Sequence, residues 1–390
     1  MTGERHDAEK FFARCPRGLE PLLEEEVMAM GGETSSRAEG GVAFTGPFGL
    51  AYRVNLESRL ASRVLWRVFE GPYQNEQDVY EATRGLPWAD WFSNRLTIKV
   101  GVHAHRCRLK SLNFLTIRIK DGICDRFVQQ TGARPTVETS RPDIRVEAFL
   151  DQHRISLYLD TSGEPLFKRG LGRARSQAPL RENLAAGILR LAGWQADEPL
   201  LDPMCGGGTI LMEAAQMALD IAPGLGRHFA FEKLNNFDRS LWRSISESRR
   251  AGSKPEARAP IYGSDHSAAS LRHAKANLEA AGLAHAVALR KADVLGSRPP
   301  AESGILVTNP PYGVRTGKTA ELALFYPRLG DVLKQAYPGW RAYFFTADLR
   351  LPKLIGLACS RRIPLFNGAL ECRLFEFKLF KGSMRRPKEA

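Results

Sequence analysis

The second half of the chain alternates short apolar runs with longer segments of helical periodicity, and this alternation constrains the fold more than any other feature. Runs that predict strands are 199–201, 260–263, 287–290, 305–308 and 340–346, and the periodic segments are 209–219, 268–281 and 320–336. Such alternation is typical of a mostly parallel sheet with helices packed on it. A closing pair, 363–366 and 370–380, predicts an antiparallel edge. The fold class predicted for this half is α/β, doubly wound.

The first half predicts smaller α+β units. Its strand candidates are 10–14, 41–45, 63–69, 96–103, 144–150 and 154–159, and its helix candidates are 18–30 and 112–128. Helix 112–128 carries one apolar stripe formed by Leu112, Leu115, Ile119, Ile123 and Phe127. A turn-rich, basic stretch at 161–175 predicts a linker between the two halves. The aromatic-containing segment 223–254 fits neither half.

The charge balance predicts a polyanionic partner. The chain has 56 Lys+Arg against 43 Asp+Glu, a formal net charge of +13 and a pI near 9.6. Residues 99–120 contain no acid, and 168–169 add two cations in the linker. A single basic run is more often a solvated face, so these residues are candidates only. The candidate RNA-binding residues are Lys99, Arg106, Arg108, Lys110, Arg118, Lys120, Lys168 and Arg169.

Several classes of protein are disfavoured by what the sequence contains. Its six cysteines are scattered without a Cys-x-x-Cys pair, so neither a zinc site nor a disulfide framework is indicated, and no metal is expected. The first ten residues are polar, and no apolar run of about 18 residues occurs. We therefore expect a cytoplasmic, monomeric protein without a membrane partner.

The first motif is "LLDPMCGGGT", residues 200–209. An apolar strand ends at Asp202, a glycine-rich turn follows, and a helix begins near Thr209. Glycines in such a turn let backbone N–H groups approach a ligand at the positive end of the helix dipole. The turn lacks both the G-x-G-x-x-G spacing and the Gly-Lys-Ser/Thr of a phosphate loop, which disfavours NAD and ATP.

Two further acids follow the next two strands. Asp265, in "IYGSDHS", is placed to accept both hydroxyls of a ribose, and Asp293, in "ALRKADVL", is placed to accept from an adenine amino group. Each acid alone is more often a helix cap. Three acids at three successive strand ends indicate an adenosine without phosphates, S-adenosyl-L-methionine. The candidate cofactor-binding residues are Asp202, Met204, Cys205, Gly206, Gly208, Thr209, Asp265, His266, Asp293 and Asn309.

The motif "TNPPYG", residues 308–313, follows the strand at 305–308. Proline cannot sit inside a sheet because it lacks the N–H that the ladder requires, so the strand must end there. The oxygen of Asn309 and the carbonyl of Pro310 could then accept both N–H groups of an exocyclic base amine. Pro311 would hold that carbonyl in place, and Tyr312 would stack on a base extruded from its helix. A Pro-Pro turn with an incidental asparagine is the alternative reading.

Together these motifs resemble class I S-adenosylmethionine-dependent amino-methyltransferases. In the first half, "FARCPRGLEPLLEEEVMAMGG", "LESRLASRVLWRV", "PDIRVEAFLD" and "LYLDTSGEPLFKRGL", with "APLRENLAAGILRLAGW" at the start of the second, resemble THUMP-domain RNA methyltransferases. The bacterial large-subunit (23S) rRNA guanine-N2 enzymes are the most similar group. The resemblance implies a ferredoxin-like segment (1–45), a THUMP RNA-binding domain (46–161), a linker (162–178) and a Rossmann-like methyltransferase domain (179–390).

The resemblance also implies roles for individual residues. Asp202, Gly206 and Gly208 would shape the methionine pocket, and the catalytic set would be Asn309, Pro310, Pro311 and Tyr312. Gly207 stands where relatives usually have serine, and Val314 replaces a common glutamate, so Val314 receives no role. Two alternatives stay open: an adenine-N6 methyltransferase acting on DNA or RNA, and an RNA-binding assembly factor that no longer catalyses. A single modification is expected, because the chain ends soon after its last strand.

Overall fold

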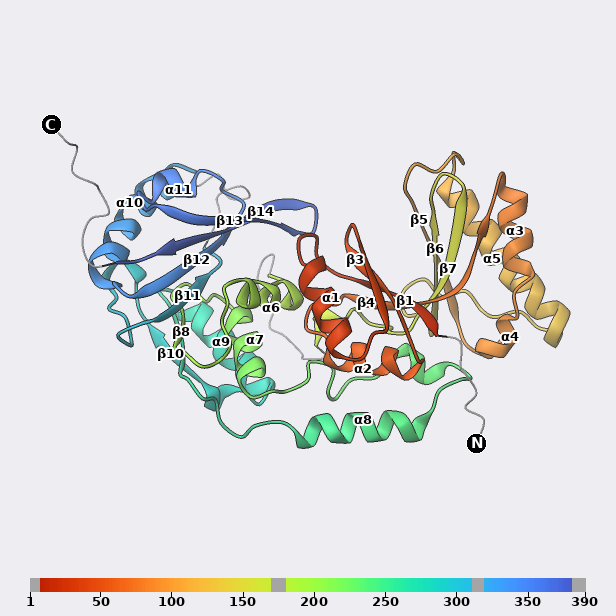
Figure 1. Cartoon of the computed structure of the whole chain (residues 1–390), viewed down its shortest axis with the longest axis horizontal. Coiled ribbons are helices and arrows are strands. Elements are labelled where there is room, and N and C mark those ends of the chain that lie inside the picture. The colour runs from red at the N-terminus through yellow and green to blue at the C-terminus, as the bar shows by residue number, and fades with distance from the viewer. Residues whose placement is uncertain (1–7, 170–179, 311–318, 381–390) are drawn as a thin grey trace. The chain divides into compact units, whose positions relative to one another are not determined.

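The computed structural model in Figure 1 describes residues 8–169, 180–310 and 319–380. The chain divides into two compact units. The first unit comprises Met1–Cys15, Glu20–Leu166 and Gly224–Ser248, and the second comprises Pro16–Leu19, Phe167–Pro223 and Arg249–Ala390.

The first unit is built on one seven-stranded sheet with the order β2-β3-β1-β4-β7-β6-β5. Its strands are β1 (Glu9–Arg14), β2 (Thr34–Ala38), β3 (Gly41–Gly46), β4 (Arg63–Pro72), β5 (Ile98–Ala104), β6 (Ile144–Leu150) and β7 (Arg154–Asp160). Only β5 and β6 pair in parallel, and the other neighbours are antiparallel. The helices are α1 (Glu20–Ala29), α2 (Gly49–Glu57), α3 (Glu76–Arg84), α4 (Trp88–Trp91) and α5 (Leu112–Thr131).

The structure confirms most of the apolar stripe that was predicted for helix α5. Leu115, Ile119, Ile123 and Phe127 are fully buried, and the helix packs on α3 and β5. Leu112 is the exception, with 38% of its surface exposed, because it is the first residue after the cap formed by Ser111.

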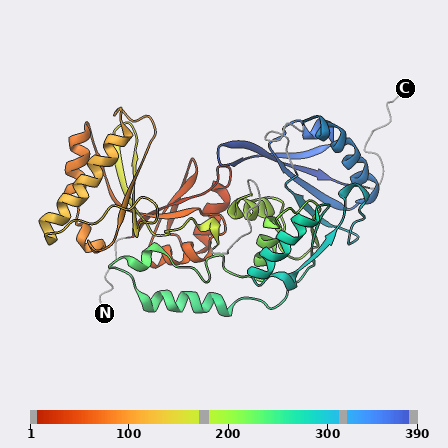
Figure 2. The same cartoon turned by 180° about the vertical axis from the view of Figure 1, so that it is seen from behind.

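The second unit is an α/β sheet with the order β10-β9-β8-β11-β12-β14-β13 (Figures 1 and 2). Its strands are β8 (Leu200–Asp202), β9 (Ile261–Asp265), β10 (Val287–Lys291), β11 (Gly304–Thr308), β12 (Trp340–Thr346), β13 (Cys359–Asn367) and β14 (Leu370–Lys378). The first five strands of this order are parallel, and β14 pairs antiparallel with both β12 and β13. The predicted fold class, with its antiparallel last strand, is confirmed.

Helices cover both faces of this second sheet. They are α6 (Glu182–Leu191), α7 (Thr209–Ala218), α9 (Ala268–Ala280), α10 (Thr319–Ala336) and α11 (Leu351–Leu354). The core between α10, α11 and the sheet is rich in aromatic residues, including Tyr326, Trp340, Phe344 and Phe377. The strand order reverses at β8, which lies between β9 and β11. Ligands of open α/β sheets bind at the carboxyl ends of strands at such a reversal point.

The segment 224–248, which the sequence left unassigned, belongs to the first unit although the chain around it belongs to the second. We call this segment the strap. Its side chains Phe229, Phe231 and Trp242 gather with Tyr52 of α2; the Phe231 and Tyr52 ring centroids are 4.5 Å apart. Asn235 adds hydrogen bonds from its side chain to the carbonyls of residues 89 and 90.

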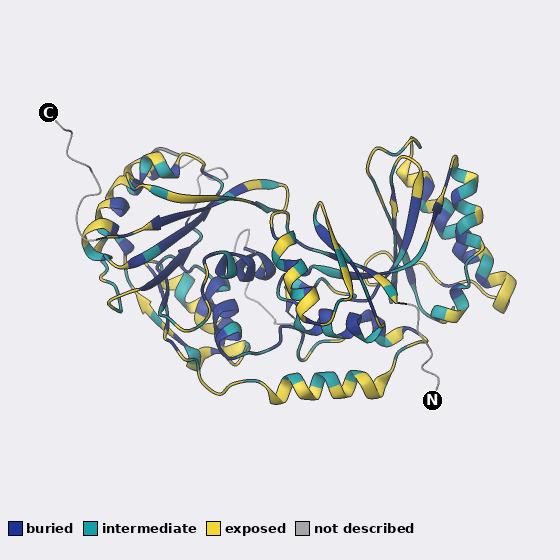
Figure 3. Cartoon of the chain, viewed as in Figure 1, coloured by how far each residue is buried: buried dark blue, intermediate teal, exposed yellow. Residues whose placement is uncertain are grey.

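Helix α8 (Arg239–Ala251) begins in the strap. None of its residues is fully buried, and Figure 3 shows it exposed along most of its length. The strap is therefore anchored by its aromatic residues rather than by a buried helix face.

Among the residues that the structure describes, no helix combines the length and apolar character needed to cross a bilayer. No group of three or more His, Cys, Asp or Glu residues among them is arranged to hold a metal ion.

Candidate active site

The glycine-rich turn connects β8 to α7 and has the left-handed backbone that glycine allows. Gly206 has φ +53° and Gly208, the residue that precedes α7, has φ +80°. A Cβ on Gly208 would lie 3.2 Å from the Cβ of Ala274, so α9 packs closely against the turn. A Cβ on Gly206 would meet no atom of the described residues within 4 Å, so none of these residues covers the backbone at Gly206. The turn thus offers a ligand close access to its peptide groups.

Asp202 is buried at the end of β8 and links this strand to β11. Its Oδ1 accepts hydrogen bonds from the hydroxyl of Thr308 (2.9 Å) and from the N–H of Met204 (3.2 Å). The pKa of Asp202 is raised to about 7, mainly by burial; the two hydrogen bonds oppose this rise, and the nearby Asp265 carboxylate adds to it. Asp202 is therefore a carboxyl group that a bound cation would help to ionise.

Asp265 holds the glycine-rich turn from the neighbouring strand. Its Oδ2 accepts from the N–H of Gly206 at 3.0 Å, and its Oδ1 accepts from the N–H of Ser267 at 2.8 Å. Asp265 is buried, whereas His266 beside it is exposed. The structure thus brings the first two predicted acids together at one turn, in agreement with a shared cofactor site.

The remaining predicted cofactor residues have mixed environments. Asp293 is exposed and caps a short helical turn by accepting from the N–H of Leu295 at 2.9 Å, which is the capping role that a lone acid usually has. The thiol of Cys205 is buried, which raises its pKa, and Met204 and Thr209 are half-buried beside it. Contact of Asp293 with an adenine therefore stays a prediction.

Asn309 follows the last residue of β11 at the same edge of the sheet. Its Oδ1 is buried and accepts no hydrogen bond from any described residue, and Pro310 beside it is buried as well. A buried acceptor without a donor costs about 1–3 kcal/mol, which a ligand N–H group would recover. The predicted partners Pro311 and Tyr312 lie outside the described residues.

The residues present fit the predicted cofactor. Three features lie at the carboxyl ends of β8, β9 and β11. They are the open backbone at Gly206, the acids Asp202 and Asp265, and the Asn309 oxygen, which has no donor in the described part of the chain. The three strands are direct neighbours, so a methyl donor held by the turn would lie beside the asparagine.

The candidate RNA-binding residues of the first unit fall into two groups. The loop between β5 and α5 exposes Arg106, Arg108 and Lys110. The Nη2 of Arg108 lies 3.5 Å from the Nε2 of His153. The other three have partners: the Lys99 ammonium donates to a carbonyl, and Lys120 pairs with Asp121.

Arg118, the third of the partnered residues, lies over the ring of Tyr80, with 4.2 Å between its Cζ and the ring centroid. The exposed loop 106–110 is therefore the part of the predicted surface with charges open to a phosphate.

The linker candidates differ from each other. Lys168 is exposed, but Arg169 is buried in the second unit, where its Nε and Nη2 each donate to a carboxylate oxygen of Glu213 at 3.0 Å. Both side chains are only 1% exposed. The prediction that Arg169 binds RNA is therefore wrong, because its guanidinium neutralises a buried carboxylate.

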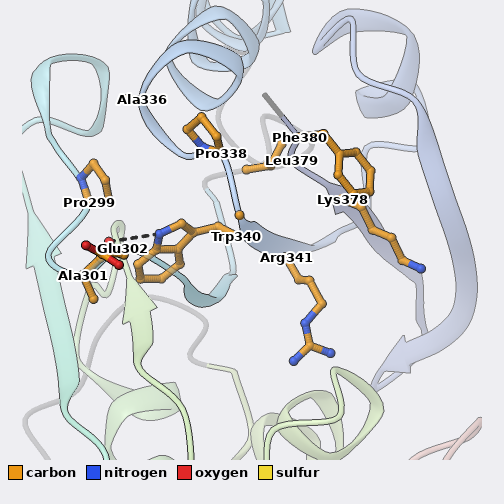
Figure 4. Close-up of a pocket in the computed structure, with 11 residues that line it drawn as sticks. Pro299, Ala301, Glu302, Ala336, Pro338, Trp340, Arg341, Lys378, Leu379 and Phe380 are labelled. Carbon is orange, nitrogen blue, oxygen red and sulfur yellow. Dashed lines mark hydrogen bonds between the residues drawn. The ribbon is translucent and has the colours of Figure 1, made fainter. Parts of the chain in front are cut away.

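A hollow at the opposite edge of the second sheet is not part of this site. Figure 4 shows it at the amino ends of β11 and β12, where Trp340 donates from Nε1 to the carbonyl of Ala301 at 3.3 Å. Glu302, Lys378 and Phe380 also line it. It lies at the edge away from Asn309 and holds none of the predicted site residues.

Family models match nearly the whole chain. The RMKL-like methyltransferase domain matches residues 169–376, the THUMP domain matches 73–160, and the RlmL ferredoxin-like domain matches 10–65. The chain belongs to the RMKL-like methyltransferases. The predicted relationship to THUMP-domain methyltransferases is thereby confirmed, and the strap lies inside the segment matched by the methyltransferase model.

Two curated relatives illustrate the similarity. A Synechocystis protein named provisionally as an RNA methyltransferase, slr0064, is 37% identical over 95% of this chain and 97% of its own. The ribosomal RNA large subunit methyltransferase K/L of Shewanella oneidensis is 38% identical over 96% of this chain. The chain spans only 54% of that Shewanella protein.

Solved structures agree with the fold. SMU.472, provisionally described as a methyltransferase and solved with S-adenosylhomocysteine, has 25% identity and a TM-score of 0.87 over 96% of this chain and 99% of its own. A Listeria monocytogenes protein described as a predicted N6-adenine-specific DNA methylase has 27% identity and a TM-score of 0.86 over 96% of this chain and 97% of its own.

The raised pKa of Asp202 predicts a pH-dependent cofactor affinity. A cationic ligand binds the carboxylate form, so binding should release a proton near pH 7, and affinity should fall by up to about tenfold per pH unit below the pKa of about 7. Calorimetry in two buffers of different ionisation enthalpy would measure the proton release. Asp202→Asn should abolish it; a variant that still releases a proton would contradict this assignment.

Proposed function

We propose that the protein transfers a methyl group from S-adenosyl-L-methionine to the exocyclic N2 amine of a guanine in large-subunit (23S) ribosomal RNA. The observation that carries the proposal is the buried Oδ1 of Asn309 at the end of β11, which has no donor among the described residues. The named activity of the K/L relatives supports ribosomal RNA as the substrate class. The family supports S-adenosyl-L-methionine as the methyl donor.

The chemistry follows from the amine. Its lone pair is delocalised into the purine ring, which makes the nitrogen a poor nucleophile. When Asn309 Oδ1 and the Pro310 carbonyl accept its two N–H groups, the nitrogen becomes pyramidal and its lone pair can point at the donor methyl. The acceptors are fixed before the reaction, so no reorganisation is needed in the transition state. The cofactor would supply an electrophilic methyl on a sulfonium: the N–CH3 bond would form as the S–CH3 bond breaks, S-adenosylhomocysteine would leave as a neutral thioether, and the amine proton would then pass to solvent.

An adenine-N6 methyltransferase is the second candidate, because the same two acceptors fit the N6 amine. The description of the Listeria structure favours it. The match to a THUMP domain and the basic loop 106–110 favour RNA over duplex DNA.

Nucleoside analysis separates the two candidates. Incubating the full chain with labelled cofactor and unmodified large-subunit rRNA should yield labelled N2-methylguanosine. N6-methyladenosine in its place would overturn the leading proposal, and mapping the labelled position would identify the nucleotide.

RNA affinity should depend steeply on salt through the exposed loop. Replacing Arg106, Arg108 and Lys110 with glutamine should reduce the slope of log K against log salt by about 2, since each phosphate contact adds about 0.7 for single strands. Fluorescence anisotropy with an rRNA fragment measures the slope. Lys120→Gln is the matched control, because its ammonium pairs with Asp121 at 2.6 Å. An unchanged slope in the triple variant would show that the loop is ordinary solvated surface.

A further inference from the structure

Beyond the end of β12, a buried carboxylate holds an exposed arginine. The Nε of Arg350 donates to Asp348 Oδ1 at 2.9 Å and its Nη2 donates to Oδ2 at 2.8 Å. Asp348 has a side chain only 7% exposed, whereas that of Arg350 is 54% exposed. Two parallel hydrogen bonds fix the plane of a guanidinium as well as its position.

The pair uses only one edge of the arginine fork. No described residue accepts a hydrogen bond from Nη1, so the outer edge, formed by Nη1 and the second N–H of Nη2, keeps its donors free. The backbone N–H of Asp348 donates to Thr346 Oγ1 at 3.0 Å, which ties the pair to the end of β12. The guanidinium of Arg350 therefore presents two N–H donors in a fixed plane beyond the end of β12.

The location is the carboxyl edge that carries Asn309. Strands β11 and β12 are hydrogen-bonded neighbours in which Thr308 is level with Phe344, so Asn309 and Pro310 are level with the last two residues of β12. Neighbouring strands lie about 4.8 Å apart. Leu349, between the two members of the ion pair, is 51% exposed, which leaves an apolar surface beside the arginine.

A purely structural role explains only part of this arrangement. Asp348 also accepts from the backbone N–H of Arg350 at 3.1 Å, just before the short helix α11 (Leu351–Leu354). That contact gives the Asp348 carboxylate a structural role before α11. It does not explain why the exposed guanidinium of Arg350 is aligned by two further hydrogen bonds, because an ion pair with a solvent-exposed arginine adds little stability.

We propose that Arg350, positioned by Asp348, recognises the O6 and N7 acceptors of the guanine whose N2 amine is held by Asn309. Two donors of an arginine match these two acceptors, which is the commonest specific contact between proteins and guanine. Adenine carries an amino donor in place of O6 and would face the arginine donor to donor. This proposal rests on the proposed function. It assigns to Arg350 the selection of guanine over adenine at the site where Asn309 binds the base amine.

The test compares guanine with 2,6-diaminopurine at the mapped nucleotide of a synthetic rRNA hairpin. The analogue keeps the N2 amine and N7 but carries an amino donor in place of O6. The full-length wild-type chain should prefer guanine in kcat/KM by roughly 10- to 100-fold, the range for one bidentate contact. In Arg350→Ala, this preference should fall to nearly onefold, because the loss affects the guanine substrate alone.

Three variants separate base recognition from other roles. Lys353→Ala removes an exposed cation of the same turn and should leave the preference unchanged. Arg350→Lys keeps the charge without the fork and should not restore the preference; restoration would indicate a phosphate contact and overturn the proposal. Asp348→Asn should lower the preference while Arg350 is still present, as expected for a positioning residue.

The outcomes distinguish a failure of the Arg350 proposal from a failure of the proposed guanine-N2 methyltransferase activity. If Arg350→Ala lowers kcat/KM equally for both substrates, the proposal is wrong and the guanine-N2 activity stands. If wild-type protein methylates neither N2 amine, the proposed function itself fails.

Discussion

Asn309→Ala should lower turnover by at least about 100-fold while the dissociation constant of S-adenosyl-L-methionine stays close to that of the wild type. The asparagine oxygen is buried at the end of β11 without a donor among the described residues, so it is prepared for a substrate amine. Removing one preorganised polar group from an active site typically costs two to three orders of magnitude in turnover.

Single-turnover methylation and calorimetric cofactor titration measure these two quantities separately. The titration is also the control for folding, because Asp202 and Asp265, which hold the glycine-rich turn, are the residues predicted to bind the cofactor. Normal turnover in Asn309→Ala would falsify the amine-holding role, and a large loss of cofactor affinity would indicate that the variant perturbs the sheet edge instead.

Phe231→Ala should destabilise the first unit by about 3–5 kcal/mol, the range for deleting a buried phenylalanine. The side chain is fully buried, and its ring lies 4.5 Å from Tyr52 and 5.1 Å from both Phe229 and Trp242, measured between centroids. The backbone N–H of Phe231 also donates to the carbonyl of Thr161 at 3.0 Å, next to β7.

Hydrogen exchange measures this effect unit by unit, which matters because a chain of two units need not unfold in one step. Amides of β4 and β7 should exchange faster in Phe231→Ala, while those of β11 and β12 should keep their rates. Arg243→Ala, at a side chain 77% exposed on the same strap, should change neither set. Equal acceleration in both sheets would show that the strap stabilises the whole chain.

The sequence predicted the second unit more fully than the first, for a physical reason. In a parallel sheet the strands are buried on both faces, so they appear as short apolar runs, and polar residues directly after them mark the functional edge. This pattern predicts Asp202, Asp265 and Asn309 at the carboxyl edge of the sheet, where the structure places them. The same reasoning missed Asp348 and Arg350, since they follow β12 without a glycine-rich or proline-rich motif to mark them.

Helix α3 and the strap were not predicted because local pattern was weak or misleading there. Residues 76–84 of α3 bury only Val79 and Thr83, too few to form a clear apolar stripe. The strap packs its aromatic residues against α2, which lies about 180 residues earlier in the chain. A local pattern of apolar residues cannot indicate a packing partner so distant in the sequence.

Arg169 shows a different limit. A basic stretch in a sequence does not reveal whether one of its members meets a buried acid, and Glu213 sits on α7, far along the chain. An arginine that neutralises a buried carboxylate is indistinguishable by composition from one that faces RNA.

The strap also limits how the protein can be divided or synthesised. The first unit is complete only once residues 224–248 have been translated. Its sheet therefore cannot finish folding until the ribosome has made the aromatic residues of the strap, which lie within the methyltransferase segment of the sequence. A fragment cut to 169–376, the span of the methyltransferase match, would leave Phe229, Phe231 and Trp242 without Tyr52. Such a fragment should aggregate, whereas the intact polypeptide should not.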